Sequence, residues 1–310
     1  TYILTLESTA SFWDCGEFIA SGYKLEVGHP PGNPIFMLTA RFFANFASSP
    51  SEVAYMVNLM SGLLSAATIL LLFWTITRLA QKIVLREGET EETMSLGQMI
   101  AILGSGLVGA LAYAWSDTFW FSAVEGEVYA YSSFCTALVF WLILKWESVA
   151  DLPHANRYII LIAYIIGVSI AVHLLNLLCI PAIVLVYYYR KYKNTDLKGS
   201  LIALLVSFVL IVLLLYGLVP GFVEVAGWVE LLFVNVFHLP FNSGVVFYFF
   251  LIVGVIAWAI YETYAQRSDK LIKISFLISI VLVGIPFIGD GYIIGIVLTA
   301  VLAYYLFTRK

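Results

Sequence analysis

The sequence has 310 residues, of which 62% are hydrophobic and 12% are charged, and its net charge at pH 7 is −4. Soluble domains carry roughly 25% charged residues, so this composition excludes an ordinary soluble protein and predicts an integral membrane protein. The apolar runs are unbroken, whereas β-barrel strands alternate apolar and polar residues, so we expect spanning α-helices. We expect no nucleic-acid partner.

Apolar stretches that are long enough to cross a membrane recur along the chain. A span needs about 20 apolar residues, or fewer where helices pack inside a bundle. Residues 1–8 resemble the last turns of a span whose start is missing, so we interpret the chain as a fragment. The sequence predicts one all-α, polytopic transmembrane domain over residues 1–310, with about ten spanning helices. After the truncated first helix, the expected spans are 54–80, 98–116, 128–146, 157–172, 174–190, 199–220, 245–265, 271–288 and 291–307.

The basic residues predict how these spans are oriented. All of the 16 Lys and Arg residues except Lys24 and Arg41 fall on one predicted side, which the positive-inside rule makes cytoplasmic. Arg157 and Arg190 share that side only if residues 157–190 form a hairpin of two short helices. We therefore expect a turn near Gly167–His173.

The opposite, non-cytoplasmic side receives the remaining loops. It includes a first outer loop at 9–52 and a turn at Pro286–Gly291. Residues 221–244 are amphipathic and rich in aromatic side chains, so we expect them to lie along the membrane interface as a short helix. A helix is also expected at about 34–47, because Pro34 suits a first helical turn.

The first outer loop carries the pattern that points most directly to chemistry. Asp14 and Glu17 are three residues apart, which places both carboxylates on one face of a helix. Such a pair suits general acid–base catalysis, because each carboxylate raises the pKa of the other. The turn at 28–32, "GHPPG", is rigid and can hold the His29 imidazole in place. The spacing alone leaves open that these are solvated loop charges and that His29 caps a helix.

Three stretches of the sequence carry a resemblance to a known family. "SFWDCGEFIASGYKLEVGHPPGNPIF" at 11–36 resembles the opening signature of a bacterial membrane family, which is related to the eukaryotic transmembrane O-mannosyltransferase of plexin and Met-type receptors. "EGEVYA" at 125–130 and "GVSIAVHLLNLLCIPA" at 167–182 also resemble family stretches. The resemblance implies a GT-C-like glycosyltransferase, which takes a sugar from a polyprenyl-phosphate carrier on the non-cytoplasmic side of the membrane.

The resemblance also implies roles for individual residues. Asp14 matches the catalytic acidic position, so we expect it to be the general base of an inverting transfer. Glu17 is expected to be the second catalytic residue, which either tunes Asp14 or holds the acceptor. The acceptor is expected to be a Ser or Thr hydroxyl of an exported protein, and no metal or other cofactor is expected. The location expected is the bacterial inner membrane, with the active site facing the periplasm. The residues expected to bind the substrates are His29, Arg41, Glu125, Glu127, His173 and Asn176.

Several of these assignments have alternatives. Arg41 is the best candidate for a phosphate contact, but it can equally be an arginine whose charge reaches the membrane interface. His173 and Asn176 are a polar pair that either binds substrate or hydrogen-bonds neighbouring backbone. The alternative for the whole protein is a transporter or flippase for a lipid-linked or anionic substrate, because carboxylates and a histidine also form proton relays. Transporters usually carry such groups at mid-membrane in inverted repeats, and no repeat is visible here.

Overall fold

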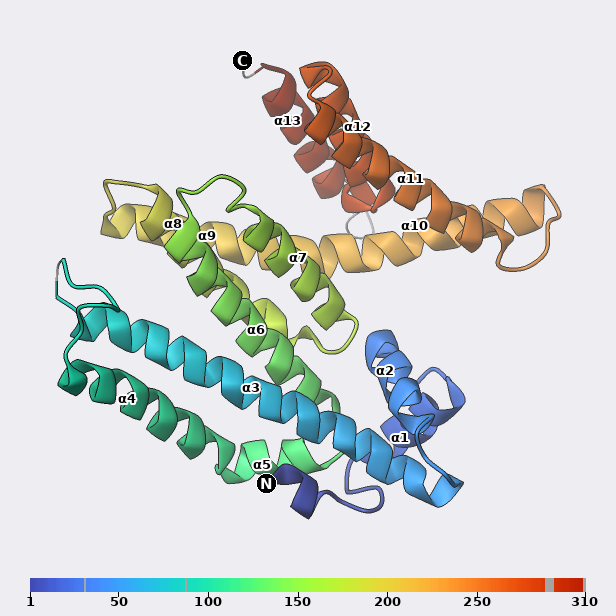
Figure 1. The fold of residues 1–310 in the computed structure, drawn as a ribbon. Helices are drawn as coiled ribbons and strands as arrows, with labels where there is room; N and C mark the ends of the chain where they lie inside the picture. The colour runs from blue at the N-terminus through green and yellow to red at the C-terminus, as the bar shows by residue number, and fades with distance from the viewer. Residues whose placement is uncertain (31, 87, 288–292, 309–310) are drawn as a thin grey trace. The chain divides into compact units, whose positions relative to one another are not determined.

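The computed structural model describes residues 1–30, 32–86, 88–287 and 293–308, and within these ranges every regular element is a helix. The chain divides into two compact units, Thr1–Leu204 and Leu205–Lys310. Figure 1 shows the helices of both units. The first unit contains α1 Cys15–Lys24, α2 Pro34–Ala44, α3 Val53–Val84, α4 Leu96–Ala114, α5 Asp117–Val124, α6 Val128–Val149, α7 Arg157–Ile170 and α8 Ile180–Lys191. The unit boundary falls within α9 Leu197–Val212, and the second unit continues with α10 Val219–Leu231, α11 Ser243–Ala265, α12 Asp269–Leu282 and α13 Ile293–Thr308.

The predicted all-α, polytopic membrane fold is confirmed. Among the described residues, seven helical segments are long and apolar enough to cross a membrane. Two further predicted spans are the shorter apolar helices α7 and α13. With 14 residues, α7 is about 21 Å long, which is less than the hydrocarbon core of a typical bilayer. The predicted partial span at 1–8 contains a 3-10 helix, Tyr2–Thr5.

The first unit is built around α3, which lies beside α4 and α6 (Figure 1). Small residues allow α4 to approach α3 closely. A Cβ atom on Gly106 would lie 2.5 Å from Thr77 Cγ2, and one on Gly109 would lie 2.6 Å from Ile76 Cδ1. Helices inside membranes commonly meet at such small residues, because backbone proximity increases van der Waals contact.

Basic residues gather at one end of the first unit, and we call residues 78–86, 145–157 and 190–198 the basic end. There Lys82 on α3 pairs with Glu147 on α6, and Arg190 on α8 pairs with Asp151. The predicted hairpin at 157–190 is confirmed, since α7 ends at Ile170 and the chain turns back before α8. The 22 residues of α6 extend about 33 Å from the basic end to the opposite end.

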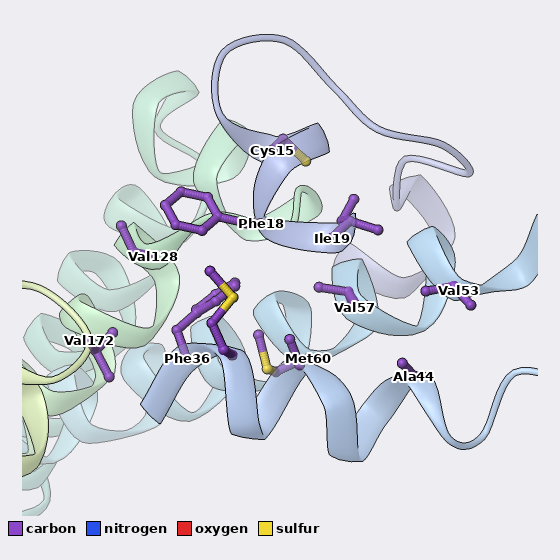
Figure 2. Packing of buried hydrophobic residues seen from close by; sticks show 12 residues of the cluster. Cys15, Phe18, Ile19, Phe36, Ala44, Val53, Val57, Met60, Val128 and Val172 are labelled. Carbon is purple, nitrogen blue, oxygen red and sulfur yellow. The ribbon is translucent and has the colours of Figure 1, made fainter. Parts of the chain in front are cut away.

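At that opposite end, α1 and α2 form a small helical pair that packs onto α3. Figure 2 shows Phe18 of α1, Phe36 of α2 and Met60 of α3 meeting in one apolar cluster. Phe18 and Phe36 have ring centroids 5.2 Å apart. The closest approach is at Gly22, where a Cβ would lie 2.7 Å from the Cβ of Ala40. This packing fixes the first outer loop against the bundle. The predicted helix beginning at Pro34 is confirmed as α2.

The prediction of a separate short helix within residues 221–244 was wrong. These residues do not begin with a separate interfacial helix, because one helical run extends from Leu197 to Val236. A proline normally breaks a helix because it lacks an N–H donor. Here the wider π-helix Leu213–Leu218 ends two residues before Pro220 and accommodates the proline without ending the run.

Two further details belong to the second unit. The carboxylate of Glu230 accepts hydrogen bonds from the backbone N–H groups of Asn242 at 2.6 Å and Val245 at 3.0 Å. It therefore caps the first turn of α11, where a negative charge is favourable. The predicted turn at Pro286–Gly291 begins in the 3-10 helix Ile285–Phe287, and its later residues lie outside the described ranges.

Candidate active site

The local backbone around α1 brings the predicted catalytic acids together. Asp14 is the N-cap residue of α1, and Glu17 lies in the first turn. Negative charge is stabilised at this position by the helix dipole. At the other end of α1, Leu25 adopts a left-handed conformation with φ of 55° and stops the helix. The chain then turns back, and His29 returns to the start of α1.

His29 is held by Glu17 through two contacts. Its backbone N–H donates to Glu17 Oε1 at 2.6 Å, and its Nδ1 lies 3.1 Å from Glu17 Oε2. The other ring nitrogen, Nε2, lies 4.0 Å from Asp14 Oδ2. The hydrogen bond from the His29 backbone lowers the pKa of Glu17, and the contact with the imidazole adds to this effect. The structure thus forms an Asp14–His29–Glu17 cluster, which is partly open to solvent.

A second pair of carboxylates approaches this cluster from a distant part of the sequence. Glu125 and Glu127 lie on the turn between α5 and α6, and both are buried. Gly126 between them packs tightly, since a Cβ there would lie 3.0 Å from Asn58 Oδ1 and from Val57 Cγ1. The turn is therefore fixed against α3 with no room for a larger residue.

Burial changes the protonation of this pair. Burial, together with the charges of Glu125 and Asp14, raises the pKa of Glu127 to about 7, although a hydrogen bond from the Val128 backbone and the nearby His29 act in the opposite direction. Burial also raises the pKa of Glu125, with the charge of Glu7 adding to the effect. The carboxyl of Glu127 can therefore hold a proton at neutral pH and donate a hydrogen bond to a ligand.

The structure does not bring Arg41 to the cluster. Its guanidinium donates to the carbonyl oxygen of Tyr23 and lies 5.3 Å from the centre of the Tyr23 ring. Tyr23 is nine residues along α1 from Asp14, a distance of about 13 Å on a helix. Lys24 is also occupied, since its ammonium lies 3.9 Å from Glu26. In the part of the chain that the structure describes, His29 is the group at the cluster that can carry positive charge.

The other predicted polar pair, His173 and Asn176, lies at the same end of the first unit as the Asp14–His29–Glu17 cluster. The turn that follows α7 is tied to the first outer loop, because the backbone N–H of Ile35, at the start of α2, donates to Ala171 O. His173 accepts a hydrogen bond from the backbone N–H of Leu175, and its ring centroid lies 5.5 Å from that of Tyr129. Asn176 is buried, and neither polar atom of its side chain has a hydrogen-bond partner among the described residues.

A groove begins at Tyr129 and follows α6 toward the basic end. Its volume is about 610 Å³. One stripe of α6 forms its wall at the helical spacing i, i+3, i+4, from Tyr129 through Ser133 and Ala137 to Phe140. Residues of α3, α4 and the 3-10 helix Leu174–Cys179 form the other walls. The stripe on α6 is about 16 Å long. We call this cavity the α6 groove.

Two polar residues of this region were not predicted as part of the site. Asn58 is fully buried on α3, and its amide donates to the backbone oxygens of Glu7 and Thr9. It therefore fixes the segment that leads into Asp14. Its signal in the sequence is a polar residue inside an apolar span. Tyr129 lies within "EGEVYA", but its contact with His173 depends on the fold.

The Asp14–His29–Glu17 cluster also contains the side chains of a possible metal site. Asp14, Glu17 and His29 offer ligand atoms that all lie within 4.8 Å of one another. Carboxylate and imidazole ligands suit several divalent cations. Glu17 already binds both the backbone and the ring of His29, so these contacts account for the cluster without an ion, and the predicted mechanism uses none.

The chain is similar to two proteins that share one name. The protein O-mannosyl-transferase TMEM260 of Mus musculus is 26% identical over 201 residues, covering 65% of this chain and 26% of the mouse protein. The protein of the same name from Dictyostelium discoideum is 23% identical over 182 residues, covering 56% of this chain and 20% of that protein. The chain thus spans about a quarter or less of the length of these relatives.

No solved structure matches the chain, so the GT-C-like assignment stays a prediction. A family model, described as the N-terminal domain of protein O-mannosyl-transferase TMEM260, matches residues 14–196. The match covers more than half of the chain. It begins at Asp14 and includes His29, the Glu125–Glu127 turn, His173 and the whole α6 groove. The chain is an integral membrane protein that belongs to the TMEM260 N-terminal domain family of protein O-mannosyl-transferases.

Proposed function

We propose that this protein transfers mannose from a polyprenyl-phosphate carrier to a Ser or Thr hydroxyl of an exported protein. The observation that supports this most is the meeting of the Asp14–His29–Glu17 cluster with the buried Glu125–Glu127 turn. The family membership supports the sugar and the protein acceptor. The orientation follows from the basic residues at the opposite end, which favour a cytoplasmic location. In a bacterial inner membrane the acidic cluster then faces the periplasm.

In the proposed reaction, Asp14 acts as the general base. It takes the proton of the acceptor hydroxyl as the oxygen attacks the anomeric carbon from the face opposite the phosphate. The new carbon–oxygen bond forms while the bond to the phosphate oxygen breaks, and the polyprenyl phosphate leaves with the electron pair. The configuration inverts without a covalent enzyme intermediate, as in inverting glycosidases where a carboxylate activates the attacking oxygen.

The neighbouring groups divide the remaining tasks. Glu17 orients His29, whose Nε2 side is then directed toward the leaving phosphate, where a cationic imidazole stabilises developing negative charge. The protonated carboxyl of Glu127 donates a hydrogen bond to a sugar hydroxyl. His173 and Asn176 complete the polar lining near the mouth of the α6 groove. The apolar part of that groove holds the polyprenyl chain of the carrier, so a longer chain buries more methylenes there.

The direct test is a transfer assay with the full-length protein in vesicles. Labelled polyprenyl-phospho-mannose is added with a Ser/Thr peptide or with the same peptide carrying alanine at those positions. We expect labelled mannose on the hydroxyl peptide and none on the alanine peptide. Movement of the labelled lipid across the vesicle membrane, with no transfer to peptide, would contradict the proposal and support the transporter alternative.

The same assay tests the α6 groove with donors of two and eleven isoprene units. Ser133→Trp and Ala137→Trp fill the groove, and Val108→Trp, on an exposed position of α4 outside it, is the control. We expect the groove variants to raise the KM of the long-chain donor by about tenfold or more, because each buried methylene contributes about 0.8 kcal/mol. The KM of the short-chain donor should change less. Equal changes for both donors in the groove variants would show that the chain binds elsewhere.

A further inference from the structure

A second cavity lies at the basic end, far from the candidate active site along α6. Its volume is about 260 Å³, and it lies between α3 and α6 beneath the loop that joins α3 to α4. Arg78 of α3 and Lys145 of α6 line it from two sides, and Glu91 of the loop lines it as well. The cavity thus combines two positive charges and one negative charge in a small space.

The two basic residues that line this cavity, Arg78 and Lys145, differ from neighbouring basic residues in their ion pairing. Lys82 pairs with Glu147, and Arg190 pairs with Asp151. In contrast, Arg78 donates to a neutral group, Gln81 Oε1, at 3.2 Å. Neither Arg78 nor Lys145 forms an ion pair within the ranges that the structure describes. Arg78, Lys145 and Glu91 together give the cavity a net positive charge, so it favours a group that carries a negative charge.

Tryptophan residues place this cavity at the level of lipid headgroups. Trp74 lies one helical turn before Arg78, and Trp141 lies one turn before Lys145. Both indoles line the cavity, and their ring centroids are 5.8 Å apart. Tryptophan is enriched at membrane–water interfaces, and basic side chains extend from there toward water. Basic cavities between spanning helices are known to bind lipid headgroups.

We propose that this cavity binds the headgroup of a phosphatidylethanolamine-type lipid. The phosphodiester lies between Arg78 and Lys145, which form charge-assisted hydrogen bonds to its oxygens. Ser148 supplies a further hydroxyl in the lining. The ammonium group donates to the carboxylate of Glu91, which would repel a purely anionic headgroup. A lipid bound in this way joins α3, α6 and the loop, and the site is separate from the proposed transferase reaction.

The test measures lipid binding to the delipidated, full-length protein in detergent by native mass spectrometry and by thermal midpoint. The probes are phosphatidylethanolamine, phosphatidylglycerol, phosphatidylcholine and inorganic phosphate. We expect phosphatidylethanolamine to bind most tightly and to raise the midpoint. Phosphatidylcholine should bind more weakly, because its ammonium has no N–H to donate to Glu91. Tighter binding of phosphatidylglycerol, or equal stabilisation by inorganic phosphate, would overturn the proposed occupant.

Variants identify the site. The double variant Arg78→Gln/Lys145→Gln should weaken phosphatidylethanolamine binding by about tenfold or more. The control Lys193→Gln/Lys198→Gln removes the same charge from exposed positions of the basic end and should leave binding unchanged. Glu91→Gln should remove the preference for phosphatidylethanolamine over phosphatidylglycerol. Equal binding by the wild type and the Arg78/Lys145 variant would refute the site even if mannosyl transfer is demonstrated.

Discussion

Asp14→Asn is expected to lower mannosyl transfer by about 10²-fold or more, the scale of a lost general base. The amide has nearly the same size as the carboxylate and serves equally well at a helix N-cap, so α1 should remain folded. What disappears is the ability to accept the proton of the attacking hydroxyl. The measurement is the initial rate of transfer from polyprenyl-phospho-mannose to the hydroxyl peptide, at saturating donor.

Asp117→Asn is the matched control, because Asp117 is also an acidic residue at the start of a helix. It lies in the first turn of α5 and makes no contact with the Asp14–His29–Glu17 cluster in the proposed mechanism. Its variant should keep most of the wild-type rate. A wild-type rate in the Asp14 variant would remove Asp14 from its proposed role, whereas equal losses in both variants would indicate general damage.

Glu127→Gln is expected to change how stability depends on pH. In the folded protein burial raises the pKa of Glu127 from 4.5 to about 7. Between these values the folded state binds more protons than the unfolded state, so wild-type stability falls as the pH rises through this window. A shift of this size corresponds to at most about 3.5 kcal/mol, at about 1.4 kcal/mol for each pKa unit. The variant cannot ionise and should escape this loss.

The measurement is the thermal unfolding midpoint of the wild type and of the Glu127→Gln variant in detergent, between about pH 5 and pH 8. The variant should gain stability relative to the wild type as the pH rises, and the two should differ least at the acidic end. Glu26→Gln, at an exposed position in the first outer loop, is the control and should show no such trend. Parallel pH curves for wild type and the Glu127 variant would show that this carboxyl is ionised throughout the range.

The sequence was sufficient to predict the spans and the local part of the site. Hydropathy and the basic residues determine where the helices cross and where the 157–190 hairpin turns. Asp14 and Glu17 lie on one helix, so their proximity follows from helical spacing. The contact of Glu17 with His29 also arises within one short loop, between residues 12 positions apart.

Contacts between distant segments could not be predicted in the same way. Glu127 reaches the cluster because Gly126 and Asn58 fit together across α3 and α6, and such packing leaves no periodic signal in the sequence. Arg41 was expected near the phosphate, yet it binds Tyr23 at the far end of α1. Residues 221–244 were expected to form a separate helix, but a π-helix before Pro220 lets the preceding helix continue, and no local pattern in the sequence predicts this.

A double-mutant cycle tests most directly whether residues 14 and 127 form one catalytic pocket. Transfer kcat/KM is measured for wild type, Asp14→Asn, Glu127→Gln and the double variant. If Asp14 acts on the acceptor hydroxyl and Glu127 on the sugar in one transition state, the double variant loses less than the product of the single losses. The expected coupling is about 0.5–3 kcal/mol. Losses that simply multiply would place the two residues at independent positions and contradict this account.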